Sequence, residues 1–538
     1  RALHEKEERS LTRAKFFVIV LICSFCWYAV PGYLFPTITT ISWVCWAFPK
    51  SVTAQQLGSG LSGLGFGALT LDWSAVSSFL GNPLVCPFFA IVNVFVGYFP
   101  VIFVVVPVAY WGFDLFGGRR FPIFSSGLFT SQGRRYNISA IVNGEFEIDV
   151  AAYEEQGKLY ISTFFALIYG VGFASVASTL THVGLFHGRE IYETYRDSSK
   201  GKVDIHTRLM RRYEDIPCWW FYAVAGATLG VSLTMCFVMK SEIHFPWWGL
   251  ILASAIAFVF TLPVSIITAT TNQTVPLGLF SEYMMGLINP GKPIANACFR
   301  VYAYATLSQA VSFLSDFKLG HYMKIPPKSM FIVQTLGTIL AGAVNMVVAW
   351  WLLTSIENIC DTALLPPGSI WTCPYDRIFY ADTVIWGLIG PRRTFGELGN
   401  YDPINWFFLA GASGPVAVWL LHRAFPKQSW IPLINLPVLL GSSYFMFPAA
   451  PLNYNAWIVI GTAFNFFVFR YRKDWWKRYN YILAAALDAG VAFMSVLIYF
   501  SLGKWNVGID WWGSGGDHCD LATCPTAKGI QVDGCPIY

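Results

Sequence analysis

The feature that most constrains this chain is a succession of long apolar segments. A helix needs roughly twenty apolar residues to cross a bilayer core about 30 Å thick. In hydrocarbon, backbone groups must be hydrogen-bonded within the chain, which favours helices. The apolar segments are 15–36, 84–112, 159–187, 218–238, 246–268, 329–354, 405–422, 430–449, 455–470 and 480–502, with shorter, broken candidates at 38–60, 275–289 and 294–314. We therefore predict an all-α polytopic membrane protein of about 12–13 helical spans, some of them broken or re-entrant, in one integral-membrane domain over 1–538.

The composition supports a membrane protein. Of the 538 residues, 55% are hydrophobic and only 12% are charged, whereas a soluble protein carries about 25% charged residues. The mean hydropathy is +0.50. A net charge of +5 is too small to indicate a nucleic-acid partner.

The basic residues predict which side of the membrane each loop faces, because short cytoplasmic loops carry an excess of Lys and Arg. The segments 1–15, 188–217, 422–427 and 470–478 are basic, so we predict that they are cytoplasmic. The loops 113–157 and 355–403 and the Cys-containing tail 503–538 then lie outside. Asn137 begins a sequon that accepts a glycan in a secretory setting, and an unused sequon is an equally open alternative.

One polar stretch, 289–330, lies between two long apolar segments. Pro290, Gly291 and Pro293 cannot continue a helix, because proline lacks the amide donor and clashes with the preceding turn. Broken helices at membrane depth are typical of transport sites. An ordinary surface loop is the alternative. The polar residues in the stretch are Asn289, Lys292, Asn296, Arg300, Gln309, Asp316, Lys318 and His321.

The same stretch resembles the signature region of the oligopeptide transporter family. The run from Pro290 to Tyr304 and the block 317–328 carry the resemblance. The family motif Lys-Ile-Pro-Pro-Arg corresponds to Lys324, Ile325, Pro326, Pro327 and Lys328, where the final Lys keeps the charge but lacks the Arg fork. Similarity to plant-type members extends over the whole chain, through 43–46, 71–73, 246–249 and the Cys-Pro-rich tail.

The resemblance implies a proton-coupled transporter of short peptides in the plasma membrane, with protons, the lipid bilayer and a peptide as its partners. Some relatives move glutathione-type thiol peptides or metal-chelate complexes, and these substrates stay open as alternatives. A membrane-embedded enzyme or scaffold is an alternative of another class, and it predicts no flux. Family members carry further spans before the point that corresponds to Arg1, so the sequence resembles an N-terminally incomplete member.

The Gly-rich run 58–67 includes a match to the dinucleotide-binding fingerprint. That motif requires a preceding strand and an acidic residue about twenty positions further on, whereas Asp72 lies too close. Glycines in a membrane either let helices approach closely or break a helix beside a cavity. The second role predicts a substrate path that includes Gln55, Gln56, Gly60 and Gly63.

Three ionisable residues lie inside apolar segments. Glu282, His182 and Asp488 are candidates for proton coupling, because an ionisable group at low dielectric can take up and release a proton near neutral pH. Each can equally be a structural residue that pairs with a neighbouring helix. Glu282 is the preferred candidate because it precedes the break at Pro290. A peptide also presents a carboxylate, which Lys292 or Arg300 can bind, and Asn296 completes the predicted binding set.

The twelve cysteines fall into two groups. We predict a disulfide between Cys360 and Cys373 in a segment facing an oxidising compartment, and the tail pairing of Cys519, Cys524 and Cys535 stays open. Zinc is disfavoured because Cys-x4-Cys-x10-Cys lacks the usual close pair spacing. The cysteines assigned to the apolar core are Cys23, Cys26, Cys45, Cys86, Cys218, Cys236 and Cys298.

The sequence lacks motifs for several kinds of energy source or catalysis. It contains no Walker A motif, no nucleophile elbow with a Ser-His-Asp arrangement and no His-Glu-x-x-His. Met284 and Met285 are adjacent and point in different directions on a helix, so they do not form a soft-metal site. We predict no enzyme activity, no cofactor and no bound metal, and any coupling then uses an ion gradient.

Overall fold

The computed structural model describes residues 11–196, 205–359, 364–365, 373–505, 507–527, 532 and 535. In this part of the chain, 9 helices are long and apolar enough to cross a membrane. The all-α, multi-pass prediction is confirmed. The candidate spans are Arg13–Leu34, Phe88–Gly112, Thr163–Phe186, Cys218–Val238, Trp247–Thr271, Pro327–Ser355, Asp402–Ala424, Pro451–Tyr471 and Lys473–Trp505.

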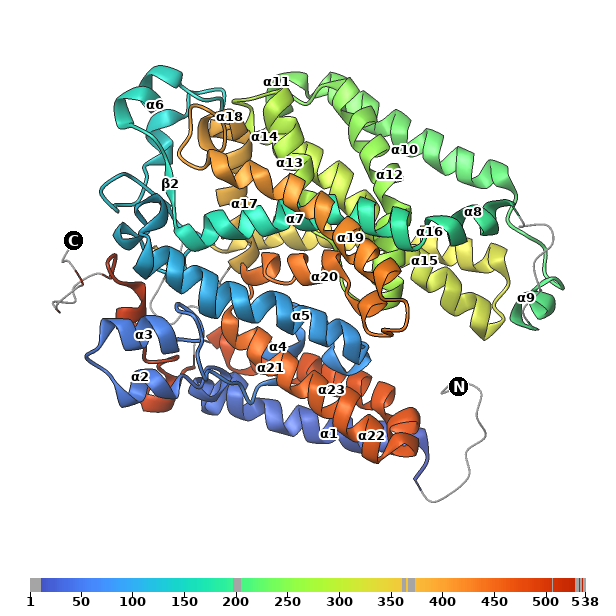
Figure 1. Cartoon of the computed structure of the whole chain (residues 1–538). Coiled ribbons are helices and arrows are strands. Elements are labelled where there is room, and N and C mark those ends of the chain that lie inside the picture. Colours follow the sequence, from blue (N-terminus) through green and yellow to red (C-terminus); the bar gives the residue numbers. More distant parts are fainter. Residues whose placement is uncertain are drawn as a thin grey trace.

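The long helix α7 (Thr163–Phe186) crosses the middle of the molecule (Figure 1). It is the most buried of the described spans, with 89% of its apolar window covered. Its small residues explain this burial. A Cβ on Gly172 would lie 2.6 Å from the side chain of Leu279 and 2.8 Å from that of Tyr444. Glycine at such crossings lets neighbouring helices approach closely.

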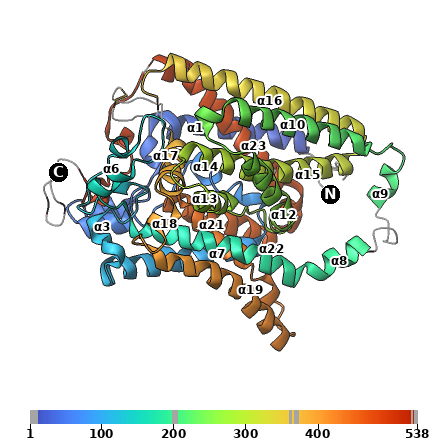
Figure 2. The same ribbon diagram turned by 90° about the horizontal axis from the view of Figure 1, so that it is seen from above.

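The helices α10 (Cys218–Val238) and α16 (Pro327–Ser355) lie at one edge of the molecule (Figure 2) and meet near their first turns. The rings of Trp220 and Phe331 are 5.6 Å apart across this contact. Their apolar windows are 6% and 0% buried, so these two helices form an outer wall with apolar side chains facing the lipid.

The two groups of loops that the basic residues assign to opposite sides of the membrane lie at opposite ends of the molecule (Figure 1). One end holds the short helices α2 (Trp43–Ala47), α3 (Val52–Gly58) and α6 (Val150–Gln156). The other holds α8 (Gly188–Arg196) and α9 (Ile205–Met210). Which end is cytoplasmic stays a prediction.

A small antiparallel sheet completes the first of these ends. Its strands are β1 (Leu128–Phe129) and β2 (Tyr160–Ile161), with Leu128 opposite Ile161. The second strand leads directly into α7. The sheet therefore fixes the loop 113–157 to the start of the central helix.

Two broken hairpins face α7. The first hairpin, 277–300, consists of α13 (Leu277–Ile288), a turn, and α14 (Pro293–Arg300). The chain then continues through the π-helical segment η8 (Val301–Ala305) into α15 (Thr306–Met323). Pro290 and Pro293 delimit the turn, as predicted from their inability to extend a helix.

The second hairpin, 436–462, has the same plan. It consists of α20 (Leu436–Gly441), the short turn η12 (Tyr444–Met446) and α21 (Pro451–Thr462). Pro448 and Pro451 delimit its turn, and the π-helical segment η13 (Ala463–Val468) follows α21. The prediction of one complete span over 430–449 is therefore wrong, because the prolines within this apolar segment divide it into short helices.

The two hairpins belong to two similar successions of elements. In each succession a long helix comes before the hairpin and another comes after it. The helices are α12 (Trp247–Thr271) and α16 around the first hairpin, and α19 (Trp406–Ala424) and α23 (Lys473–Ser501) around the second. The molecule thus uses one structural plan twice.

The segment 355–403 is not the simple loop that the sequence predicts. Its described part contains α17 (Pro374–Asp382), the π-helical segment η9 (Thr383–Ile389) and α18 (Pro391–Thr394). Trp386 in η9 is fully buried. The apolar run between Asp382 and Gly390 is much shorter than the roughly twenty residues of a span, so hydropathy did not identify it.

Candidate functional site

A buried cluster of three charged residues lies where the first hairpin meets α17. Arg300 Nη1 is 2.8 Å from Glu282 Oε1 and 3.0 Å from Asp382 Oδ2. The carboxylate side chains are 0% and 4% exposed, and the Arg300 side chain is 18% exposed. We call Glu282, Arg300 and Asp382 the charge cluster. It joins α13, α14 and α17 through charge-assisted hydrogen bonds.

Glycines allow these elements to come this close. A Cβ on Gly286 would lie 2.2 Å from the backbone oxygen of Trp386, and a Cβ on Gly387 would lie 2.7 Å from Cα of Pro293. At the turn, Gly291 has a φ of +82° and donates its N–H to the oxygen of Gly387 at 3.0 Å. The first hairpin is therefore locked against η9 backbone to backbone.

Neutral side chains surround the charge cluster. Tyr169 on α7 donates its hydroxyl to Asp382 Oδ1 at 2.6 Å. Asn296 donates its amide N–H groups to the backbone oxygens of Glu282 at 2.9 Å and of Trp386 at 3.4 Å. The Phe379 ring centre lies 4.8 Å from the Arg300 guanidinium, within the range of a cation–π contact.

The two carboxylates are not equivalent. Both oxygens of Asp382 accept hydrogen bonds, from Tyr169 and from Arg300. Glu282 accepts only through Oε1, and its buried Oε2 has no partner among the described residues. The buried atoms Asn296 Oδ1 and Trp386 Nε1 likewise lack partners in the described part of the chain. Glu282 Oε2 and Asn296 Oδ1 can each accept a hydrogen bond and Trp386 Nε1 can donate one, so three buried polar atoms keep unused hydrogen-bonding capacity in the described residues.

The structure brings together three of the predicted residues, namely Glu282, Asn296 and Arg300. The sequence did not single out Asp382, Tyr169 or Trp386. A short apolar run that follows Asp382 and ends at Gly390-Pro391 was a signal for a half-length helix. Nothing in the sequence around Tyr169 distinguishes it from other aromatic residues of an apolar span.

Lys292 lies apart from the charge cluster, at the turn of the first hairpin. Its Nζ is 3.3 Å from Glu147 Oε1, and His244 Nδ1 is 3.9 Å from the same oxygen. Ile148 N–H donates to Gly291 at 3.2 Å, so this loop covers the turn. Glu145, Glu147 and His244 offer possible metal-ligand atoms within 4.8 Å of one another, but the Lys292 ammonium competes for Glu147.

The predicted path residues near the Gly-rich run bind the tail and the second hairpin. Gln55 Oε1 accepts from Leu521 N–H at 2.8 Å, and Gln56 Nε2 donates to the Cys524 oxygen at 3.1 Å. The oxygen of Gly60 accepts from the N–H of Leu452 in the second hairpin. A Cβ on Gly63 would lie 2.3 Å from the oxygen of Gln56. A role of these four residues in binding substrate stays a prediction.

The other two candidates for proton coupling lie elsewhere. His182 is buried on α7, its ring stacks on Phe186 at 4.7 Å, and its Nδ1 has no partner in the described residues. Asp488 on α23 accepts from Trp73 Nε1 at 2.7 Å and from Asn82 Nδ2 at 2.9 Å. Asp488 thus connects both ends of the segment 73–82 to α23. These two hydrogen bonds give Asp488 a structural role.

The block Lys324–Lys328 lies at the end of the molecule that carries α9. Lys324 ends α15 in a left-handed conformation and contacts His206. Lys328 contacts Glu214, and this hydrogen bond lowers the pKa of that exposed carboxyl. Ile325, Pro326 and Pro327 complete the connection between α15 and α16. The block therefore holds the basic loop rather than the charge cluster.

Among the described residues, one disulfide joins the tail to the rest of the molecule and a second closes a loop within the tail. Cys45 pairs with Cys519 across a sequence separation of 474, and Cys524 pairs with Cys535. Cys45 is fully buried, as predicted for a core residue, but it is not free, because it forms this disulfide with the tail. Cys360 lies outside the described residues, so its predicted pairing with Cys373 stays a prediction.

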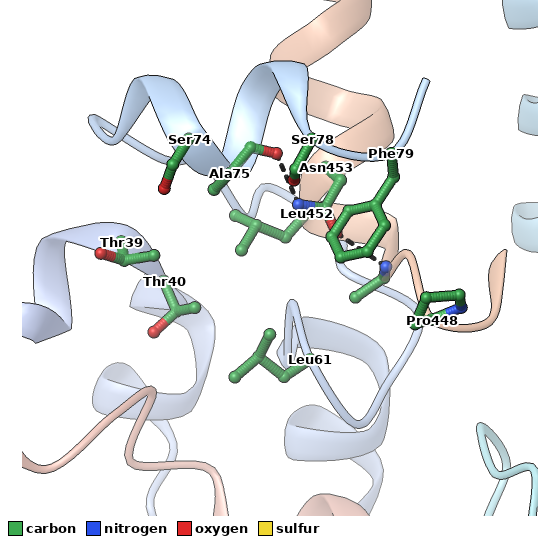
Figure 3. A pocket seen from close by; sticks show the side chains of 11 residues that line it. Thr39, Thr40, Leu61, Ser74, Ala75, Ser78, Phe79, Pro448, Leu452 and Asn453 are labelled. Carbon is green, nitrogen blue, oxygen red and sulfur yellow. Dashed lines mark hydrogen bonds between the residues drawn. The ribbon is translucent and has the colours of Figure 1, made fainter. Parts of the chain in front are cut away.

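A second site lies beside the second hairpin, where a cavity of about 320 Å³ is lined partly by hydroxyl groups (Figure 3). We call it the hydroxyl cavity. Asp72 lies behind two of these hydroxyls and is 4% exposed. Burial raises the pKa of Asp72, whereas hydrogen bonds from Ser74 oppose the rise. The lining residues are Thr39, Thr40, Leu61, Ser74, Ala75, Ser78, Phe79, Pro448, Ala450, Leu452 and Asn453.

Comparison with known proteins gives one consistent result. The family model described as OPT oligopeptide transporter protein matches residues 1–502. The chain is 66% identical to Oligopeptide transporter 4 of Arabidopsis thaliana over 537 residues, which cover 100% of this chain and 74% of that protein. It is 61% identical to Oligopeptide transporter 2 of the same plant over 539 residues, with coverages of 100% and 73%. For Oligopeptide transporter 3 the identity is 52% over 541 residues, with coverages of 100% and 73%.

Proposed function

Because the chain belongs to the oligopeptide transporter family, we propose that it is a secondary active transporter that carries short oligopeptides together with protons. The family is one of transporters rather than enzymes, and the long apolar helices make the chain an integral multi-pass membrane protein. Peptide transport follows from the family. The charge cluster supports proton coupling and indicates which residues perform it.

The observation that carries the proposal is the charge balance of this cluster. One guanidinium, Arg300, lies between two buried carboxylates, Glu282 and Asp382. With both carboxylates ionised the cluster has a net charge of minus one, and a buried unbalanced charge is costly. One proton, or one cationic group of a ligand, makes the cluster neutral. The site therefore favours the uptake of a single positive charge.

The hydrogen bonds indicate which carboxylate takes the proton. Asp382 is held by two donors, which stabilise its ionised form. Glu282 Oε2 lacks a donor and is buried. The amide N–H groups of Asn296 already point to backbone oxygens, so its buried Oδ1 stays free to accept a hydrogen bond. We infer that the coupling proton resides on Glu282.

Protonation of Glu282 then prepares Arg300 for the substrate. A neutral carboxyl attracts the guanidinium less than a carboxylate does, so Arg300 can turn one edge to the C-terminal carboxylate of a peptide. The peptide ammonium balances that carboxylate. The loaded site, with its proton and a zwitterionic peptide, is therefore neutral overall. A neutral complex is the form that crosses a low-dielectric barrier at the least cost.

The test is uptake of a labelled tetrapeptide into proteoliposomes that contain the full-length protein and carry a pH gradient. Glu282→Gln keeps the shape of the side chain but cannot exchange a proton. We expect this variant to bind peptide, to lose the pH dependence of uptake and to fail to accumulate peptide against its gradient. Glu190→Gln serves as a control, because it makes the same chemical change at an exposed carboxylate on α8, outside the charge cluster. Unaltered pH dependence in Glu282→Gln would exclude Glu282, and His182→Gln and Asp488→Asn would be tested next.

The same assay separates the alternative substrates. Unlabelled glutathione or an iron- or copper-chelate complex is added as a competitor at increasing concentration. A metal-chelate or glutathione carrier would take up little labelled tetrapeptide, and these compounds would compete strongly with that uptake. We further propose a plasma-membrane location, which a fluorescent fusion of the full-length protein tests directly.

A further inference from the structure

Three interrupted stretches of backbone meet at the hydroxyl cavity. Thr39 and Thr40 are the last residue and the C-cap of the short 3-10 helix η2 (Pro36–Thr39), Leu61 belongs to the Gly-rich run, and Pro448 and Ala450 belong to the turn of the second hairpin (Figure 3). Irregular backbone at membrane depth is tolerated only where it is buried in protein or lines a cavity. In transporters, breaks of this kind surround the substrate. The convergence of three breaks therefore points to a ligand site.

The hydroxyl groups of the cavity have hydrogen-bonding capacity to spare. Thr39 and Ser74 donate to Asp72 Oδ2 at 3.3 Å and 2.7 Å, which leaves their own oxygens as acceptors. In the part of the chain that the structure describes, the hydroxyls of Thr40 and Ser78 have no hydrogen-bond partner. Hydroxyls of both kinds can meet an amide N–H or an amide oxygen.

The remaining lining is apolar or already occupied. Leu61, Phe79 and Leu452 form the apolar wall. The Asn453 side chain already forms two hydrogen bonds. Its Nδ2 donates to the Ala75 oxygen at 2.6 Å, and its Oδ1 accepts from Ala450 N–H at 2.8 Å. Apart from the shielded Asp72, no charged side chain of the described residues borders the cavity. The cavity thus suits an uncharged group with both polar and apolar atoms.

The size of the cavity limits what fits. Its volume of about 320 Å³ lies near the lower end of the range of about 300–1,000 Å³ for small-molecule sites. Such a volume holds one part of a short peptide rather than all of it. The two hairpins adjoin at α7, because Tyr444 of the second hairpin and Leu279 of the first both lie against Gly172.

We propose that the hydroxyl cavity is the part of the substrate site that takes an uncharged side chain of the peptide together with its adjoining amide group. This inference rests on the proposed function, in which the charge cluster binds the charged ends of the peptide. The two sites divide the recognition of one molecule. The second site sets preference among peptides of equal charge.

The test uses two labelled tetrapeptides of equal charge, tetra-alanine and a version with leucine at its two central positions. Ser78→Phe fills the cavity from α4 (Trp73–Ser77) and the turn that follows it. We expect it to raise the KM of uptake for the leucine peptide at least about tenfold relative to tetra-alanine. Ser77→Phe is the matched control, because residue 77 adds the same ring without lining the cavity. An unchanged ratio of the two KM values would overturn the proposal.

A second variant tests the cavity even if Ser78→Phe does not fold. Thr40→Val keeps the shape of the side chain and removes its hydroxyl, so the apparent KM should rise about twofold to tenfold for both peptides, because both carry the amide that the hydroxyl meets. Peptide binding to the solubilised protein is measured in parallel. Loss of the proposed proton coupling shows as uptake that is independent of pH, whereas failure of the cavity proposal shows as an unchanged ratio of the two Kd values. This ratio is measured in Ser78→Phe, because that variant changes the space available to the peptide side chains.

Discussion

The first and second hairpins have one backbone plan and opposite chemistry. Each places a short apolar helix before a turn bounded by two prolines, at 290–293 and at 448–451, and in each a π-helical segment follows the second helix. The first hairpin contributes Glu282 and Arg300 to the charge cluster. The second contributes only uncharged residues to the hydroxyl cavity. The plan supplies interrupted backbone near α7, and the side chains decide what the interruption recognises.

The difference also predicts how strongly each hairpin depends on its polar contacts. Removing one partner from a buried ion pair leaves an uncompensated charge and costs about 3–5 kcal/mol. A neutral hydrogen bond contributes about 0.5–1.5 kcal/mol. Substitutions in the first hairpin should therefore have larger effects than equivalent substitutions in the second.

The largest effect is expected for Arg300→Ala. It leaves Glu282 and Asp382 facing each other without a cation, so we expect a loss of about 3–5 kcal/mol in the free energy of unfolding and no measurable peptide uptake. Thermal unfolding of the purified protein and uptake into proteoliposomes measure the two quantities. The triple variant Arg300→Ala, Glu282→Gln, Asp382→Asn should regain stability without regaining uptake. Wild-type stability of the single variant would show that the cluster is not a tightly balanced unit.

Glycine positions give the next largest difference. A Cβ on Gly286 in the first hairpin meets the backbone oxygen of Trp386 at 2.2 Å, whereas one on Gly441 in the second meets the hydroxyl of Ser175 at 2.7 Å. A backbone atom cannot move aside as a hydroxyl can. We expect Gly286→Ala to destabilise the protein by about 1–3 kcal/mol, and Gly441→Ala to cost less. Thermal unfolding of both variants measures the two losses of stability. Equal losses would contradict the expectation that a clash with backbone costs more than a clash with a hydroxyl.

Two tyrosines permit a matched comparison. Tyr169 donates to ionised Asp382, and Tyr98 donates to the neutral Asn455 Oδ1 at 2.8 Å beside the second hairpin. Tyr169→Phe should cost about 1.5–3 kcal/mol, as for hydrogen bonds to charged groups, and Tyr98→Phe about 0.5–1.5 kcal/mol. Because the lost bond stabilised an ionised carboxylate, Tyr169→Phe should also shift the pH dependence of uptake towards higher pH. Tyr98→Phe should leave that pH profile in place, and the reverse result would contradict the assignment.

The sequence predicted the first hairpin and missed the second for a physical reason. Around Pro290 the charged residues interrupt the apolar pattern, so a break is visible. Around Pro448 the neighbours are Phe, Met, Ala and Leu, and the apolar pattern continues through the break. Hydropathy measures composition, and composition does not register a turn whose side chains are all apolar.

Contacts between residues far apart in the sequence could not be predicted, for a different reason. Arg300 and Asp382 are 82 residues apart, and Cys45 and Cys519 are 474 apart. No periodicity within one helix specifies which other helix it meets. The sequence therefore predicted that Glu282 and Arg300 flank one break. It did not identify Asp382, the second carboxylate, which gives the site one negative charge in excess.

The smallest effect is expected for Lys292→Gln, which separates the turn of the first hairpin from its charge cluster. Lys292 and Glu147 are 35% and 28% exposed, and an ion pair open to solvent contributes about 0–1 kcal/mol. We expect nearly unchanged thermal stability and a KM for tetrapeptide within about twofold of the wild type. The matched variant Arg300→Gln should abolish uptake, because the proposed mechanism gives the substrate carboxylate to Arg300 alone. A rise of about tenfold or more in KM for Lys292→Gln, the size expected for a lost charge-assisted contact, would instead place that carboxylate at the turn. The recognition of charge would then extend along the whole first hairpin, and its contrast with the second hairpin would be sharper still.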